Sequence, residues 1–149
     1  MDLETLLKSL NAREVRYVII GATAFPVHGY ARATLDVDIL IEPTEENASR
    51  MWEALRAFGY DVTDVTIKDM LAKKILIRQY LLETDIHPSA AGVTFEQVWD
   101  NRVEGAVGET PTYFAGLDEL IAMKQAAGRP KDMEDLRALL KLRERQANE

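Results

Sequence analysis

The sequence predicts an α/β (α+β) fold in which helices flank a mixed β-sheet and a C-terminal helical hairpin ends the chain. Short apolar runs of strand length, such as Tyr17–Ile20 and Ile39–Ile41, alternate with longer segments whose apolar residues recur every three or four positions. Gly128-Arg129-Pro130 interrupts the last helical pattern, which indicates a turn between two helices. Strands that alternate with helices of crossover length favour parallel pairs within the sheet.

The composition of the chain limits its function. It has 149 residues, of which 47% are hydrophobic, enough for one core. We therefore expect a single domain over residues 1–149, with a catalytic sheet core at 1–115 and the helical hairpin at 116–149. The formal net charge of −7 argues against a protein that coats nucleic acid. Because the sequence has no cysteine, no secretory leader and no apolar run of about eighteen residues, we expect a soluble, cytoplasmic protein without disulfides or a membrane span.

The N-terminal segment predicts a helix, a strand and a sharp turn. Leucines recur at helical spacing over Leu3–Leu10, and the strand Tyr17–Ile20 ends at Gly21. Glycine lets the backbone turn sharply and approach a neighbouring group closely. Ala24–Tyr30 is then predicted to be a short helix that stops at Gly29.

Two aspartates open the next strand. Asp36 and Asp38 flank Val37 and precede the apolar run Ile39–Ile41. Residues i and i+2 of a strand point to the same face, so the two carboxylates project together and repel each other unless a cation lies between them. Hard oxygen ligands suit Mg²⁺ or Mn²⁺, and we interpret the pair as a metal site. The alternative is that both are strand-end residues beside a turn.

The middle of the chain predicts a long helix, a short edge strand and a helical turn. Glu45–Phe58 has apolar residues at helical spacing, with Thr44 as its N-cap and Gly59 at its end. The length of this helix suits a crossover, so the strands on either side of it are expected to be parallel. Asp61–Val65 is expected to be an edge strand, and Lys68–Lys74 a brief helical or irregular turn.

A third carboxylate follows in the extended stretch Ile75–His87. Asp85 ends an apolar run, and a strand here can lie beside the strand that carries the aspartate pair. Glu83 shares the face of Asp85 and is the competing candidate, and an exposed strand-end aspartate is the alternative without function. His87 also shares this face, but a single histidine is interpreted as structural.

The last third of the chain predicts a helix, a β-hairpin and two further helices. We expect the helix at Phe95–Asn101, the hairpin between Val103–Val107 and Thr112–Phe114, and the helical hairpin at Leu117–Leu140. The acidic residues after the break at Gly128 lie in a first helical turn, where the helix dipole alone would favour them. They are Asp132, Glu134 and Asp135.

Three windows of this sequence resemble the nucleotidyltransferase superfamily that shares its catalytic fold with DNA polymerase beta. In that superfamily a small-residue turn after the first strand precedes Asp-x-Asp on the next strand, and a third carboxylate lies on a later strand. The spelling here is most similar to the bacterial abortive-infection (AbiEii/MenT-like) toxin nucleotidyltransferases and their small uncharacterised relatives. The residues that carry the resemblance are Gly21, Ala24, His28, Gly29, Arg32, Thr34, Asp36 and Asp38, then Asp85, then Lys124, Arg129, Lys131, Asp132 and Asp135.

The resemblance implies a nucleotidyltransferase fold and a mechanism. With Mg²⁺ (or Mn²⁺) as cofactor, a nucleoside monophosphate would pass from a nucleoside triphosphate to an acceptor hydroxyl. Asp36, Asp38 and Asp85 would hold the metals, and Asp85 would also activate the nucleophile. Ala22 stands where the family usually has glycine or serine, which removes a hydroxyl contact to phosphate, and Arg32 could instead neutralise one of the aspartates. The residues implied in nucleotide binding are Gly21, Ala22, Arg32, Thr34, Lys124 and Arg129.

The resemblance does not identify the acceptor. A tRNA acceptor would indicate a toxin, and a protein hydroxyl would indicate an AMP-transferring enzyme or an antitoxin, with a cognate antitoxin or toxin protein as partner. An aminoglycoside or lincosamide acceptor would indicate an antibiotic-resistance enzyme. The remaining alternative is a nucleotide- or partner-binding protein that keeps the fold without turnover.

Overall fold

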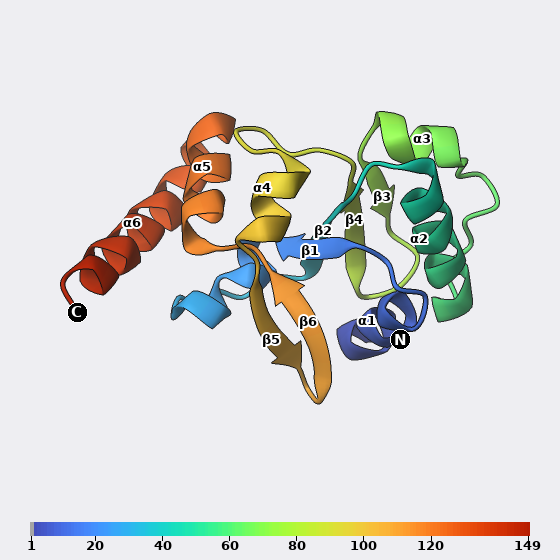
Figure 1. Cartoon of the computed structure of the whole chain (residues 1–149), viewed down its shortest axis with the longest axis horizontal. Helices are drawn as coiled ribbons and strands as arrows, with labels where there is room; N and C mark the ends of the chain where they lie inside the picture. Colours follow the sequence, from blue (N-terminus) through green and yellow to red (C-terminus); the bar gives the residue numbers. More distant parts are fainter. Residues whose placement is uncertain (1) are drawn as a thin grey trace.

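The sheet of this protein is mixed and six-stranded. The computed structural model describes residues 2–149 and orders the strands β3-β4-β2-β1-β6-β5 (Figure 1). The pairs β2–β4 and β1–β6 are parallel, and the other neighbouring strands are antiparallel. The strands are β1 (Tyr17–Ile20), β2 (Asp36–Ile41), β3 (Ile75–Ile77), β4 (Glu83–His87), β5 (Val103–Val107) and β6 (Thr110–Phe114).

Helices lie on both sides of this sheet. Figure 1 shows α2 and α3 beside β3 and β4, whereas α5 and α6 form a hairpin at the opposite end of the molecule. The prediction of an α/β fold with a mixed sheet, flanking helices and a C-terminal helical hairpin is confirmed. The α-helices are α1 (Leu3–Ala12), α2 (Glu45–Phe58), α3 (Ile67–Ala72), α4 (Phe95–Asp100), α5 (Leu117–Ala127) and α6 (Met133–Ala147), and the 3-10 turns are η1 (Gly21–Ala24), η2 (Pro26–His28) and η3 (Pro130–Asp132).

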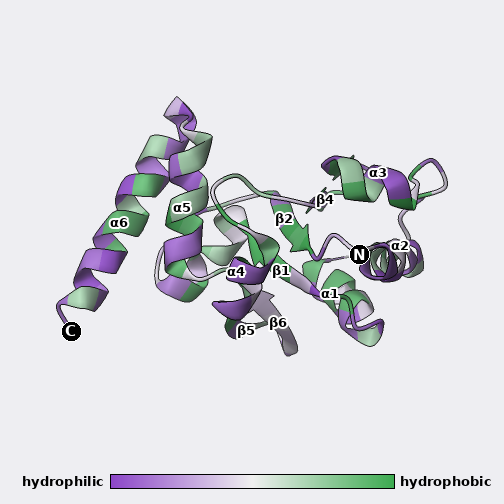
Figure 2. Cartoon of the chain, turned by 45° about the horizontal axis from the view of Figure 1, so that its top comes forward, coloured by the Kyte–Doolittle hydropathy of each residue, from purple (hydrophilic) through white to green (hydrophobic). Residues whose placement is uncertain are grey.

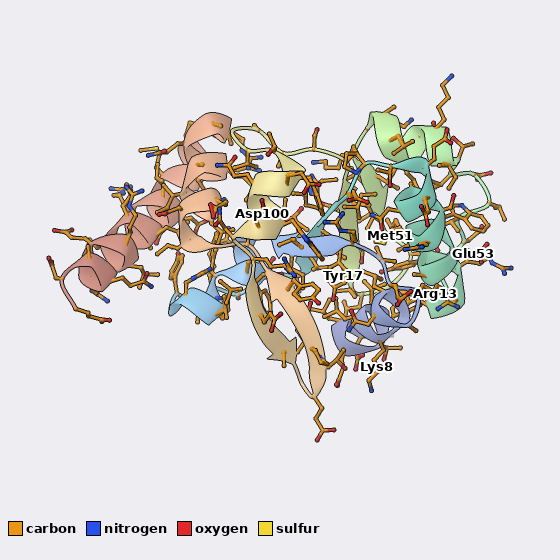
Figure 3. All side chains as sticks on the ribbon, in the orientation of Figure 1. Lys8, Arg13, Tyr17, Met51, Glu53 and Asp100 are labelled. Carbon is orange, nitrogen blue, oxygen red and sulfur yellow. The ribbon has the colours of Figure 1, made fainter. Side chains whose placement is uncertain are left out.

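One face of the sheet is buried beneath α1 and α2. The Tyr17 hydroxyl of β1 donates a hydrogen bond of 2.9 Å to Oδ1 of Asn11 in α1. The Ser9 hydroxyl of α1 donates to the Ala54 carbonyl of α2 at 2.7 Å, which joins the two helices. Tyr17 and Met51, both labelled in Figure 3, are fully buried in this layer. The main hydrophobic core therefore lies on the side of the sheet away from the aspartates.

The opposite face of β2 and β4 carries the acidic residues. Asp36 and Asp38 are half-buried, whereas Val37 between them is buried, as the period-two alternation of a strand requires. The parallel register places Asp38 beside Asp85, and Asp36 beside Glu83. The prediction that Asp85 lies on a strand next to the aspartate pair is confirmed.

The helix predicted at Glu45–Phe58 is α2, and it begins and ends at its expected capping residues. The backbone N–H of Asn47 donates to Thr44 Oγ1 at the start of α2, and Gly59, with φ 119°, ends that helix. Figure 2 shows hydrophobic and hydrophilic residues alternating along α6, which suits a helix that packs one face on α5. No helix within residues 2–149 is long and apolar enough to cross a membrane.

The predicted edge strand at Asp61–Val65 is wrong, because this segment is a loop. Side chains take up the backbone hydrogen bonds that a neighbouring strand would have satisfied. The Gln79 side-chain amide accepts a hydrogen bond from the N–H of Asp61 and donates one to its carbonyl. The Trp52 indole donates to the carbonyls of Val62 and Val65. Val62 is buried, so the apolar pattern here reflects the packing of a loop on the core.

The stretch Ile75–His87 is two strands instead of one. β3 and β4 pair antiparallel, with Leu76 opposite Asp85, and residues 78–82 connect them. As a result, the first strand after α2 is β3, and the strand that runs parallel to β2 is the second one, β4. The expectation that the strands on either side of the helix are parallel is therefore wrong for β3.

The predicted helix at Ala24–Tyr30 is instead a pair of 3-10 turns, η1 and η2. The first begins at Gly21, directly at the end of β1, and the second begins at Pro26, which has no N–H to continue the hydrogen-bond pattern of the first. Gly29, with φ 100°, ends the segment as expected.

Candidate active site

Asp38, Asp85 and His87 form a compact group on the polar face of the sheet. The register of β2 and β4 sets Asp38 beside Asp85, and His87 lies one step further along β4 on the same face. His87 Nε2 lies 2.8 Å from Asp38 Oδ1. One ligand atom from each of the three residues lies within 4.8 Å of the other two. Two carboxylate oxygens and an imidazole nitrogen at this spacing fit a divalent metal ion.

Along the polar face, Asp36 lies on one side of Asp38 and His87 lies on the other. Its Oδ1 accepts a hydrogen bond of 3.1 Å from the Thr34 hydroxyl. The hydroxyls of Thr23 and Thr34 also donate to its backbone carbonyl. Thr34 therefore orients the Asp36 carboxylate, a role that the sequence did not indicate.

Arg78 holds Asp85 in place. Asp85 is buried, and Arg78 Nη1 donates a hydrogen bond of 2.7 Å to its Oδ1. Arg78 Nε also lies 3.6 Å from Glu83 Oε2. The hydrogen bond to Asp85 raises the pKa of the Arg78 guanidinium above its usual range. Sequence reasoning missed Arg78, because its contacts with Asp85 and Glu83 depend on the turn between β3 and β4, and the sequence predicts one extended stretch there.

Gly21 leaves room for Asp38. β1 ends at Ile20, whose register partner is Asp38, and Gly21 follows with φ 70°. A Cβ at Gly21 would lie 2.6 Å from Asp38 Oδ2, closer than two such atoms can approach. The sequence predicted a close backbone approach at this glycine, and the group approached is the candidate metal ligand itself.

We expect Gly21→Ala to destabilise the protein by more than the cost of its backbone conformation. An alanine at positive φ costs about 1–2 kcal/mol, and displacing Asp38 adds to this. The matched control is Gly128→Ala. Gly128 has φ 60°, and a Cβ added there would lie 3.7 Å from its nearest neighbour, the Gln125 carbonyl oxygen, which is an ordinary contact. Urea unfolding of both variants measures the difference. Equal losses in the two variants would show that Asp38 moves aside freely.

Two buried carboxylates of the C-terminal hairpin, Asp132 and Asp135, pair with basic residues that come from the hairpin and from the loop before β2. Asp132 Oδ1 lies 3.0 Å from Lys124 Nζ, and Asp132 Oδ2 lies 2.7 Å from Arg129 Nε. Asp135 Oδ1 accepts hydrogen bonds of 2.9 Å from Arg32 Nε and from the Tyr30 hydroxyl. The alternative that Arg32 neutralises Asp36 or Asp38 is therefore wrong.

Asp135 is held from both sides. Its Oδ2 is buried without a directed hydrogen bond from residues 2–149, and the Lys124 ammonium lies 3.4 Å away. Asp132 and Asp135 are both almost fully buried. A buried carboxylate needs a paired cation. The helix dipole is therefore not the only reason for aspartate at these two positions, because each also pairs with basic side chains.

The Asp132 carboxyl should contribute stability that is lost at low pH. The Arg129 hydrogen bond, followed by that of Lys124, lowers the pKa of Asp132 from 3.8 to about 2, against the opposing effect of burial. Because the folded pKa lies below the unfolded one, the stabilisation is complete above about pH 4 and disappears as the pH falls toward 2.

We expect the melting temperature of the wild type to exceed that of Asp132→Asn by a constant margin above pH 4. The margin should shrink between pH 4 and pH 2. Glu134→Gln, an exposed acid in the same turn, is the control that should show little change. A margin that stays constant down to pH 2 would contradict the depressed pKa.

Residues from both groups line one cleft of about 610 Å³. The acidic strand residues form part of its wall, and the basic residues paired with Asp132 and Asp135 form another part. All of the residues that the sequence proposed as a site are among those lining it. They are Gly21, Ala22, Arg32, Thr34, Asp36, Asp38, Asp85, Lys124 and Arg129, and the cleft adds Lys74, His87, Ser89, Lys131 and Asp132.

A second cleft, of about 650 Å³, is lined by His28, Asp118, Glu119 and Arg143 together with neighbouring residues. Burial raises the pKa of the Glu119 carboxyl there. This cleft contains none of the candidate metal-binding or nucleotide-binding residues, so the first cleft is the better candidate for the active site despite its slightly smaller volume.

Aspartates from neighbouring strands of the mixed sheet and a lysine–arginine cluster line the same cleft, as the resemblance to the nucleotidyltransferase superfamily leads us to expect. A family model described as "Nucleotidyltransferase of unknown function (DUF6036)" matches residues 1–144, and the chain belongs to this family. The match agrees with the resemblance at the level of the superfamily and does not distinguish the abortive-infection toxins within it. No curated protein matches the chain.

Proposed function

We propose that the protein is a metal-dependent nucleotidyltransferase that moves a nucleoside monophosphate from a nucleoside triphosphate to an acceptor hydroxyl. One observation carries this proposal. A single cleft is lined by carboxylates from two parallel strands and by lysine and arginine side chains from the C-terminal hairpin. The carboxylates suit a divalent metal, and the basic residues suit phosphate.

The basic residues keep capacity for a phosphate although each already has a partner. Arg32, Lys124 and Arg129 carry three positive charges against the two of Asp132 and Asp135, which leaves one positive charge in excess. A guanidinium has five N–H donors, and the ion pairs use only some of them. The two aspartates would therefore orient these side chains toward a triphosphate without neutralising them completely.

In the proposed reaction the acceptor oxygen bonds to the α-phosphorus while the bond from that phosphorus to the leaving pyrophosphate breaks. Asp36, Asp38 and Asp85 would hold Mg²⁺ or Mn²⁺, and the ion would supply stabilisation of the charge on the attacking and leaving oxygens. Asp85 also accepts the proton of the acceptor hydroxyl, in an orientation fixed by Arg78. The turn at Gly21 and Ala22 lines the same cleft, and its backbone N–H groups would contact the triphosphate.

The test is calorimetric titration with each of the four nucleoside triphosphates, with and without Mg²⁺. We expect metal-dependent binding in the wild type and its loss in the Asp36→Asn/Asp38→Asn double variant. Asp64→Asn, an exposed aspartate in the loop after α2, is the matched control that should bind normally. If the wild type binds no nucleotide at millimolar concentration, the transferase proposal fails.

Transfer of an α-³²P label then separates an enzyme from a binding protein. A transferase should move the α-label to an acceptor and release pyrophosphate, whereas an inactive member of the fold should bind nucleotide without doing either. We propose the toxin or antitoxin role implied by the abortive-infection resemblance as the setting of this activity. Label on tRNA, on a protein or on an aminoglycoside would distinguish the toxin, the AMP-transferring or antitoxin, and the resistance alternatives.

A further inference from the structure

The polar face of β2 and β4 extends one residue beyond the carboxylates, and that residue is His87. The register pairs Asp36 with Glu83, Asp38 with Asp85 and Leu40 with His87 along the two strands. His87 therefore continues the row of side chains that β4 presents beside Asp38. It lines the same cleft, and its side chain is 17% exposed, so its ring is partly shielded from water.

The position of the ring matches that of a metal ligand. Two ligands at right angles on an ion, each about 2.1 Å from it, are about 3 Å apart. His87 Nε2 and Asp38 Oδ1 are 2.8 Å apart, and a ligand atom of Asp85 lies within 4.8 Å of both. Asp36 is outside this set of three, although it lies next to Asp38 along β2.

We propose that His87 is a nitrogen ligand of the metal shared by Asp38 and Asp85, and that the site consequently prefers Mn²⁺ to Mg²⁺. This inference rests on the proposed function and names the ion that the site selects. Mg²⁺ favours oxygen ligands and keeps several of its waters, whereas an imidazole nitrogen suits first-row transition ions, of which Mn²⁺ is the weakest binder and the one closest to Mg²⁺ in its preference for carboxylates. Replacing one oxygen ligand by nitrogen therefore shifts the affinity toward Mn²⁺.

The competing role for His87 is that of a positioning residue. In that case its Nε2–H donates to Asp38 Oδ1 and orients the carboxylate, and the metal binds oxygen atoms alone. Such a histidine would affect Mg²⁺ and Mn²⁺ equally, because both would lose the same orientation of Asp38. Loss of a direct nitrogen ligand lowers the affinity for Mn²⁺ more than that for Mg²⁺. Such a ligand also gives a magnetic coupling between its ¹⁴N nucleus and the Mn²⁺ ion.

The experiment uses tag-free, full-length protein with Mn²⁺ alone, without nucleotide. Pulsed electron paramagnetic resonance detects the coupling of a directly bound imidazole ¹⁴N to Mn²⁺. The chain has two histidines, so His28→Gln is a matched control for His87→Gln. His28 Nε2 lies 2.8 Å from the Ala115 carbonyl, and His28 lines the other cleft. We expect the coupling in the wild type and in His28→Gln, and its absence in His87→Gln.

Affinities provide a second readout. The signal of free Mn²⁺ reports Mn²⁺ binding, and competition by Mg²⁺ reports the affinity for Mg²⁺. We expect His87→Gln to weaken Mn²⁺ binding about tenfold or more and Mg²⁺ binding much less. His87→Asn should behave in the same way. Equal weakening for both ions, or an unchanged Mn²⁺ affinity in folded variants, would overturn the proposal.

The wild-type spectrum alone can also overturn it, whatever the variants do. If Mn²⁺ binds and Asp38→Asn abolishes the binding, but no imidazole coupling is present, His87 is not a ligand and the carboxylate metal site stands. If Mn²⁺ alone does not bind, the inference fails. The proposed function is then judged separately by the Mg²⁺-dependent binding of nucleotide, in which the triphosphate brings its own oxygen ligands to the ion.

Discussion

Replacing Asp85 by asparagine should lower the rate of nucleotidyl transfer by about 10²–10⁴-fold, the range for loss of a general base. An asparagine cannot accept the proton of the acceptor hydroxyl and is a poorer metal ligand. The overall fold should survive, because the amide oxygen can still accept the hydrogen bond from Arg78. Release of pyrophosphate in the presence of the acceptor measures the effect.

Glu83→Gln is the matched control for Asp85→Asn. Glu83 lies on the same strand and the same face, two residues earlier, and it also contacts Arg78, at 3.6 Å. We expect its loss to change the rate only a few-fold, through the orientation of Arg78. If Glu83→Gln abolishes transfer and Asp85→Asn does not, the third carboxylate of the site is Glu83, the competing candidate from the sequence.

Replacing Asp135 by asparagine should destabilise the protein by about 3 kcal/mol, toward the lower end of the range for breaking a buried ion pair. The Asp135 side chain is 3% exposed, whereas its partners Arg32 and Lys124 are 40% and 15% exposed. Water around the Arg32 guanidinium reduces the cost, but the Lys124 ammonium stays in a partly buried position with one carboxylate fewer. Urea unfolding measures the loss.

Glu134→Gln tests the other explanation for this acidic turn. If the helix dipole is the main reason for acids at the start of α6, Glu134 and Asp135 should contribute equally, by about 0.3–1 kcal/mol each. Glu134 is exposed and Asp135 is buried, so we expect the loss at Asp135 to be several times larger. Similar losses at the two positions would contradict the role of Asp135 as the counter-ion of Arg32 and Lys124.

Local pattern was sufficient for the elements whose cause is local. The caps of α2, the apolar stripe of α1 and the break between α5 and α6 depend on residues a few positions apart, and these predictions were confirmed. Asp61–Val65 was misassigned because an apolar alternation over a few residues is the same for an edge strand and for a loop that packs on the core. The Trp52 and Gln79 side chains that satisfy this loop lie outside it, 10 and 18 positions from the backbone groups that they bond.

In the candidate site, too, some features follow from local sequence pattern and others depend on the tertiary structure. The sequence by itself determined that Asp36 and Asp38 share a face and that Gly21 makes a close turn, since these follow from strand period and glycine geometry. Only the tertiary structure decided which charges meet. His87 reaches Asp38 across 49 positions, and Arg32 reaches Asp135 across 103. Such pairs depend on strand register and on how the hairpin packs, which are set by burial of the whole core and not by any local pattern.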